Sequence, residues 1–92
     1  MKKIKVGVAG YGTIGQRLAD GVAMQEDMEL VGVADLAPTL SVQALAERDM
    51  IGANGVRYDL YLVDGADRGQ FDALHIPVAG SFEELIQKAD VI

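Results

Sequence analysis

The chain has 92 residues, a net charge of −6 and no cysteine. This length allows one small domain, and the negative charge argues against nucleic acid or an anionic membrane surface as the main partner. Without cysteine there is no disulfide, no thiolate metal ligand and no thiol nucleophile. No apolar run is long enough for a bilayer, and we expect a cytoplasmic protein without a membrane partner.

The first predicted element is a buried strand over residues 4–9. The run IKVGVA is apolar and β-branched, and glycine follows it. Residues 13 to about 24 then carry large apolar side chains at every fourth position: Ile14, Leu18 and Val22. This spacing predicts a helix with one apolar stripe.

The middle of the chain predicts a second strand, a helix and an extended segment. Residues 29–35, ELVGVAD, indicate the strand. Pro38 breaks the chain, and Ser41 is expected to cap the helix that follows. Residues 52–55, GANG, indicate a turn, and the alternation in residues 56–62 predicts an extended segment.

The last third predicts two further helices. Phe71 and Leu74 indicate a short helix that ends before Pro77. Ser81 and Glu84 have the spacing of a capping box, in which each residue binds the other's backbone N–H at a helix start. A helix with an apolar face is therefore expected after residue 81.

Strands that alternate with helices predict an α/β fold with a parallel sheet and right-handed crossovers. Val91 and Ile92 begin another apolar run, and a strand starting at Asp90 needs more residues to pair. We therefore expect a doubly wound parallel sheet in truncated form, with this chain as a piece of a longer protein.

The glycines between the first strand and the first helix match a known spacing. Gly10-x-Gly12-x-x-Gly15 after a strand and at a helix start is the dinucleotide-binding fingerprint. Gly10 would permit the tight turn, Gly12 the close approach of a pyrophosphate, and Gly15 the packing of the helix on the strand. The helix N-terminus would offer free N–H groups and partial positive charge. The alternative is a purely structural glycine turn.

Asp35 ends the second strand, about 20 residues after the last of these glycines. A carboxylate at this place is expected to accept hydrogen bonds from the adenosine ribose hydroxyls. Its charge would repel a 2′-phosphate, which favours NAD over NADP as the cofactor. The alternative is that Asp35 only ends a strand before a turn.

The other polar side chains form no catalytic or metal-binding pattern. His75, the single histidine, lies in a connection and is expected to be structural or exposed. Asp64, Asp67 and Asp72 lack the spacing of a calcium loop. Two aromatic residues on opposite faces of the extended segment are expected to be packing residues: Tyr58 and Tyr61.

The stretch KVGVAGYGTIGQRLADGVAMQEDMELVGV resembles the N-terminus of archaeal-type phosphorylating glyceraldehyde-3-phosphate dehydrogenases. RYDLYLV and IPVAGSFEELIQKADVI resemble later parts of the same region. The resemblance implies a Rossmann-type domain in which the backbone at Thr13 and Ile14 contacts the NAD(P) phosphates together with the glycines. Residues 1–92 would be the N-terminal part of this dinucleotide-binding domain, without the catalytic domain.

The resemblance also implies an activity for the whole enzyme. A cysteine thiolate attacks the aldehyde, NAD takes the hydride, and phosphate releases an acyl phosphate. The family's cysteine and general-base histidine do not map onto this chain, so we expect no catalytic residue here and no turnover by the chain alone. The implied partners are a nicotinamide dinucleotide and further copies in a homo-oligomer. Dehydrogenases of the dihydrodipicolinate reductase or homoserine dehydrogenase type, and a nucleotide-sensing module, remain open alternatives.

Overall fold

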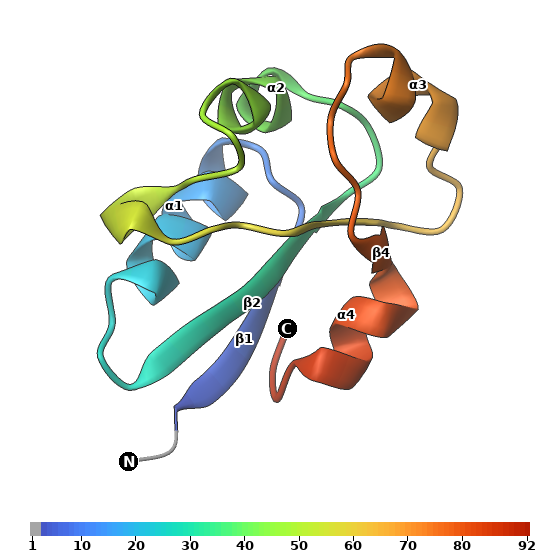
Figure 1. Cartoon of the computed structure of the whole chain (residues 1–92). Coiled ribbons are helices and arrows are strands. Elements are labelled where there is room, and N and C mark those ends of the chain that lie inside the picture. The colour runs from blue at the N-terminus through green and yellow to red at the C-terminus, as the bar shows by residue number, and fades with distance from the viewer. Residues whose placement is uncertain (1–2) are drawn as a thin grey trace.

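The computed structural model describes residues 3–92 as an α/β structure (Figure 1). Its sheet has four parallel strands in the order β1-β2-β3-β4, which confirms the predicted fold class. The elements, in chain order, are β1 (Ile4–Ala9), α1 (Thr13–Ala23), β2 (Met28–Asp35), α2 (Leu40–Glu47), the 3₁₀-helix η1 (Ala53–Gly55), β3 (Leu60–Leu62), α3 (Arg68–Ala73), β4 (Gly80–Ser81) and α4 (Phe82–Lys88).

Strand β1 has neighbours on both of its edges. β2 lies on one side, and Val91 forms a parallel bridge with Val6 on the other, where the Gly7 N–H donates to the Val91 carbonyl at 2.9 Å. The strand order therefore reverses at β1. In open parallel sheets, ligands bind at such a reversal, beyond the carboxyl ends of the strands. The loop from β1 to α1 occupies this position.

The core is split between the two faces of the sheet. One cluster lies under α1 and α2 and includes Tyr11 and Tyr58; the other lies under α4 and includes Tyr61 and Leu85. Tyr58 and Tyr61 thus pack on opposite faces, as predicted. A bulge in β2 leaves Val31 without a partner in β1 and shifts the alternation of side chains between the faces.

Helix α1 is present, but two of the three large apolar residues of its predicted stripe are largely exposed. Ile14 is 76% exposed and Leu18 57% exposed, whereas Gly15 and Ala19 are buried. An apolar stripe normally faces the core, and here the small residues do so because they let the helix approach the strands closely. Ile14 and Leu18 are left largely exposed, while Val22 is partly buried against the core.

One other expectation is wrong. Thr39, rather than Ser41, caps α2, since its hydroxyl oxygen accepts the Val42 N–H at 3.3 Å. The extended segment at residues 56–62 pairs with β2 only over Leu60–Leu62. The capping box at the start of α4 is confirmed on both sides, from Ser81 and from Glu84.

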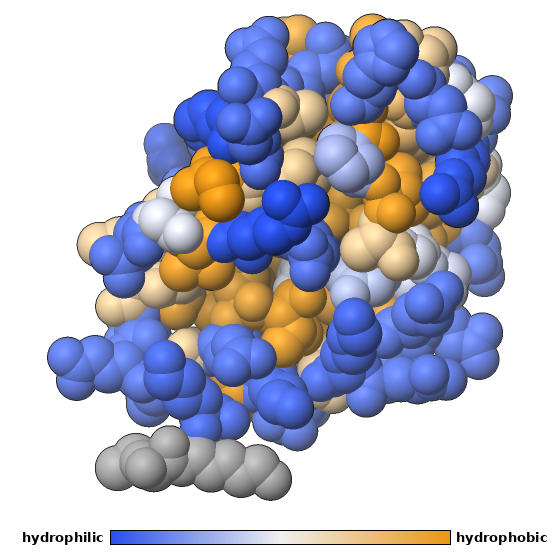
Figure 2. Space-filling model, viewed as in Figure 1, coloured by the Kyte–Doolittle hydropathy of each residue, from blue (hydrophilic) through white to orange (hydrophobic). Residues whose placement is uncertain are grey.

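The surface carries several apolar areas between polar side chains (Figure 2). In the described part of the chain, large apolar side chains with half or more of their surface exposed include Ile14, Leu18, Met24, Leu36, Leu40, Val91 and Ile92. No helix within residues 3–92 combines the length and apolarity needed to cross a membrane.

Candidate functional site

The three glycines of the loop differ in what their surroundings demand. Gly10 has a φ of +86°, in the left-handed region that favours glycine. A Cβ on Gly15 would overlap the carbonyl oxygen of Gly10, so the helix and loop pack too closely for a side chain there. A Cβ on Gly12 would meet no atom within 4 Å. The protein itself leaves the space at Gly12 open.

The start of α1 offers free hydrogen-bond donors to this space. Gly12 is the N-cap, and no side chain caps the helix. Within residues 3–92, the N–H groups of Gly12, Thr13, Ile14 and Gly15 have no acceptor, and the next one, that of Gln16, bonds to the Gly12 carbonyl at 2.8 Å. Four free donors and the positive end of a helix form an anion-binding arrangement.

An open pocket of about 460 Å³ lies against these donors. It is lined by Ala9, Gly10, Gly12, Thr13, Ile14, Gly15 and Leu18. Five of the six residues that the sequence indicated for cofactor binding thus line a single hollow. The exposed side chains of Ile14 and Leu18 form its apolar part.

The sixth residue, Asp35, lies beside the loop at the carboxyl end of β2. One oxygen of its half-buried carboxylate accepts the Tyr11 N–H at 2.9 Å, and the other accepts the Leu36 N–H at 2.7 Å. Each carboxylate oxygen can accept more than one hydrogen bond. Asp35 therefore keeps acceptor capacity for a ligand while it is bound to the loop.

Tyr11 was not indicated by the sequence, although it lies between Gly10 and Gly12. Its side chain is fully buried, and its ring meets the Tyr58 ring edge-to-face with centroids 6.2 Å apart. Burial raises the pKa of Tyr11, the charge of Asp20 raises it further, and Arg48 opposes both. The Tyr11 hydroxyl has no hydrogen-bond partner in the described part of the chain. The sequence feature that could have pointed to Tyr11 is a large aromatic side chain between two glycines of the loop.

Tyr58, which packs against the Tyr11 ring, is held by two hydrogen bonds. Its hydroxyl donates to the Asp20 carboxylate at 2.8 Å and accepts the Ala53 N–H at 3.0 Å. Burial, followed by the hydrogen bond to Asp20, raises the pKa of Tyr58 well above its usual value. Tyr58 thus links α1 and η1 beneath the glycine loop.

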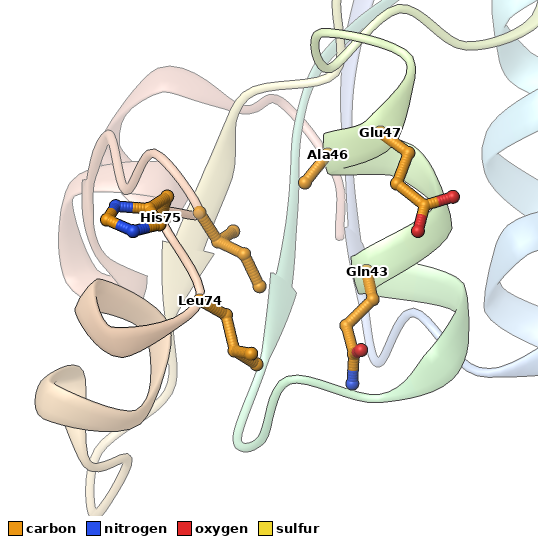
Figure 3. A pocket seen from close by; sticks show the side chains of 6 residues that line it. Gln43, Ala46, Glu47, Leu74 and His75 are labelled. Atoms are coloured by element: carbon orange, nitrogen blue, oxygen red, sulfur yellow. The ribbon is translucent and has the colours of Figure 1, made fainter.

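His75 lies at a separate pocket of about 350 Å³ between α2 and α3 (Figure 3). The side chain of Leu74 points across this pocket toward α2, and the ring of His75 points away from it (Figure 3). His75 is exposed and has a φ of +56°. Across residues 3–92 no cluster of His, Cys, Asp and Glu could hold a metal ion. The glycine loop and Asp35, by contrast, lie side by side at the carboxyl ends of β1 and β2.

Comparison with known proteins gives one consistent answer. The chain is 38% identical over 92 residues to a glyceraldehyde-3-phosphate dehydrogenase of Methanosarcina mazei. It is 40% identical to glyceraldehyde-3-phosphate dehydrogenase 1 of Methanosarcina acetivorans and 39% identical to the enzyme of Archaeoglobus fulgidus, each over 92 residues. No family model matches the chain.

These alignments include all of this chain but only 25%, 25% and 24% of the three relatives. The chain thus spans about a quarter of the length of the curated relatives it matches. The level of identity is similar in all three, and each alignment covers the chain from end to end. Over its whole length, the chain is homologous to the N-terminal part of archaeal-type glyceraldehyde-3-phosphate dehydrogenases.

Proposed function

We propose that the chain binds a nicotinamide dinucleotide as the cofactor-binding portion of a glyceraldehyde-3-phosphate dehydrogenase. The observation that carries the proposal is the group of free N–H donors at Gly12–Gly15, whose residues line an open pocket at the start of α1. A pyrophosphate would accept hydrogen bonds from these donors. The free space at Gly12 would let it approach the backbone closely.

The names of the relatives support the class of cofactor, because a dehydrogenase needs a hydride acceptor. Bound NAD or NADP supplies that acceptor. The residues of this chain would bind and orient the phosphates and the adenosine ribose. The oxidation of the aldehyde needs groups from a catalytic domain outside residues 1–92, and we propose that residues 1–92 form the N-terminal part of the dinucleotide-binding domain.

Asp35 supports NAD as the preferred cofactor. Its carboxylate has acceptor capacity for the ribose hydroxyls at the carboxyl end of β2. The same negative charge would repel the 2′-phosphate of NADP. A charge-assisted hydrogen bond contributes about 1.5–3 kcal/mol, so we expect NAD to bind at least about tenfold more tightly than NADP.

Isothermal titration of the purified chain with NAD and with NADP tests both parts of the proposal. Asp35→Ala should reduce the preference for NAD, and Asp64→Ala, which removes an equal charge from an exposed residue, should retain it. Equal affinities in the unaltered chain would refute the NAD preference. Failure of both cofactors to bind would refute the function itself. No turnover of glyceraldehyde-3-phosphate is expected from this chain.

We also propose that the chain self-associates. Leu18 is 57% exposed and Ile92 52% exposed, and both line an apolar pocket beside β1. Exposed apolar surface of this kind favours association between chains. Light scattering should show species larger than the monomer, and Leu18→Lys should shift them toward the monomer. A monomer at all concentrations would contradict this proposal.

A further inference from the structure

The hydrogen bond between Asp35 and Tyr11 raises a question that ribose recognition does not answer. Asp35 binds the N–H of the residue immediately before the free donors of Gly12–Gly15. Its negative charge therefore lies next to a loop that is proposed to hold an anion. Charge alone would weaken anion binding there.

The loop needs a restraint because its neighbouring residues are glycines. Gly10 and Gly12 flank Tyr11, and glycine populates more backbone conformations than any other residue. If Tyr11 rotated, the backbone N–H groups that follow it would change direction relative to the pocket that their residues line. The Gly10 N–H donates to the Ala34 carbonyl at 2.7 Å, and the bond from Asp35 fixes the next N–H, that of Tyr11, immediately before the free donors.

Two further contacts act on the same residue. The Thr39 hydroxyl donates to the Tyr11 carbonyl at 3.5 Å, while Thr39 also caps α2. The Tyr11 ring is fully buried against Tyr58. Asp35 supplies the shortest of the polar contacts, at 2.9 Å, and its acceptor is charged.

From these contacts we infer that Asp35 is a positioning residue for the phosphate loop. Its carboxylate holds the Tyr11 N–H, and this orients the N–H groups of Gly12–Gly15 toward the pyrophosphate, independently of any contact with the ribose. This inference rests on the proposed dinucleotide binding. It joins ribose recognition and phosphate recognition in one side chain.

A positioning role for Asp35 can be told apart from its other possible roles by how pyrophosphate affinity changes when Asp35 is replaced. Inorganic pyrophosphate has no ribose, so a carboxylate that only recognises ribose would leave its affinity unchanged on replacement. A carboxylate that acts only through its charge would make pyrophosphate bind more tightly when removed. A positioning carboxylate would make it bind more weakly when removed.

The test measures pyrophosphate affinity of the whole 92-residue chain by NMR titration for three variants. Asp35→Ala should weaken binding about three- to tenfold, the loss of one hydrogen bond that orients the donors. Asp35→Asn keeps an acceptor oxygen and should bind at least as tightly as the unaltered chain. Asp64→Ala controls for charge, because this exposed carboxylate follows β3 and is not hydrogen-bonded to the loop. Asp35→Ala binding as tightly as Asp64→Ala would overturn the inference.

Amide hydrogen exchange gives a second readout that needs neither a ligand nor a variant. The Tyr11 N–H should exchange at least about tenfold more slowly than those of Gly12, Thr13 and Ile14, since it alone has an acceptor. Equal exchange would overturn the inference even if NAD binds. If the unaltered chain binds neither NAD, NADP nor pyrophosphate, the proposed function fails, whereas a slow Tyr11 amide would show that the restraint exists without that ligand.

Discussion

Helices α1 and α4 lie on opposite faces of one sheet and begin in opposite ways. At α4, the Ser81 hydroxyl oxygen accepts the Glu84 N–H at 3.3 Å, and the Glu84 carboxylate accepts the Ser81 N–H at 3.2 Å. At α1, the N-cap is Gly12, no side chain caps the helix, and the first turn has no acidic residue. The capping box satisfies two N–H donors at the start of α4, while, among the described residues, α1 leaves its first donors free.

The other described α-helices, α2 and α3, also begin with a side-chain cap, as α4 does. Thr39 caps α2, and the Asp67 carboxylate caps α3 by accepting the Gly69 N–H at 2.9 Å. A cap of this kind contributes about 1 kcal/mol. A helix start without one gives up that stability and retains donors for an acceptor from outside. The uncapped start of α1 is therefore suited to a ligand, because side chains cap the other three described α-helices.

The largest expected effect is that of Gly12→Val on cofactor binding. The added side chain would occupy the open space where the pyrophosphate must approach, and NAD affinity should fall at least about a hundredfold. The domain should still fold, because no protein atom lies within 4 Å of the new Cβ and the φ of Gly12 is −87°. Calorimetry with NAD and circular dichroism measure the two effects.

Gly21→Ala is the matched control for that experiment. Gly21 is also on α1, its Cβ position is open, and the residue is exposed. This variant should bind NAD normally and be slightly more stable, since alanine favours helix. Normal NAD binding by Gly12→Val would contradict the phosphate role of the loop.

An intermediate effect is expected from Ser81→Ala, this time on stability. Loss of the capping box should lower the free energy of unfolding by about 1 kcal/mol and the midpoint of thermal unfolding by about 4–8 °C. NAD affinity should stay the same, because α4 begins away from the glycine loop. Ser41→Ala serves as control, because Thr39 caps α2 and Ser41 does not. Equal losses in the two variants would remove the contrast between the helix starts.

The smallest effect is expected from Tyr11→Phe. The Tyr11 hydroxyl is buried without a partner, so its removal should leave the free energy of unfolding unchanged or raise it by up to about 1 kcal/mol. Tyr58→Phe loses two hydrogen bonds and should lower that free energy by about 1–3 kcal/mol. Urea unfolding measures both. A marked loss in Tyr11→Phe would show that the hydroxyl has a partner in solution.

The raised pKa of Tyr11 adds a dependence on pH to this pair of variants. The unfolded chain loses the tyrosine proton near the ordinary pKa of about 10, before the folded chain does. The contribution of Tyr11 to the free energy of unfolding is therefore fully present below about pH 10 and is lost as the pH rises above it. Tyr11→Phe should reduce that fall. An identical alkaline loss in the variant and the unaltered chain would rule out a contribution from Tyr11.

Local patterns in the sequence were sufficient for the strand–loop–helix unit and for the α4 cap. The glycine spacing and the Ser81–Glu84 pair involve residues at most five apart, and their geometry is set within one turn of backbone. The orientation of α1 was not accessible in the same way. Ile14 and Leu18 follow an apolar period, but Gly15 and Ala19 decide which side approaches the sheet.

Contacts between distant residues were also beyond the sequence. The hydrogen bond from Tyr11 to Asp35 joins residues 24 positions apart, and a fingerprint assigns Asp35 only its contact with a ligand. Ser41 seemed a suitable cap by type, but Thr39 lies where the backbone turns into the helix. Residue type shows which side chains can cap a helix, and the tertiary structure determines which of them lies at the N-cap position.

Contacts on the two edges of β1 join residues at very different separations along the chain, and this difference bears on the order of folding. On the β2 side, the hydrogen bond between Tyr11 and Asp35 spans 24 residues; on the other side, that between Lys5 and Asp90 spans 85. Closing the longer loop costs about 1 kcal/mol more in chain entropy. The β1–α1–β2 unit is therefore expected to be structured in the folding transition state, with the glycine loop already formed, and the pairing of Val91 with β1 follows on the descent to the native state.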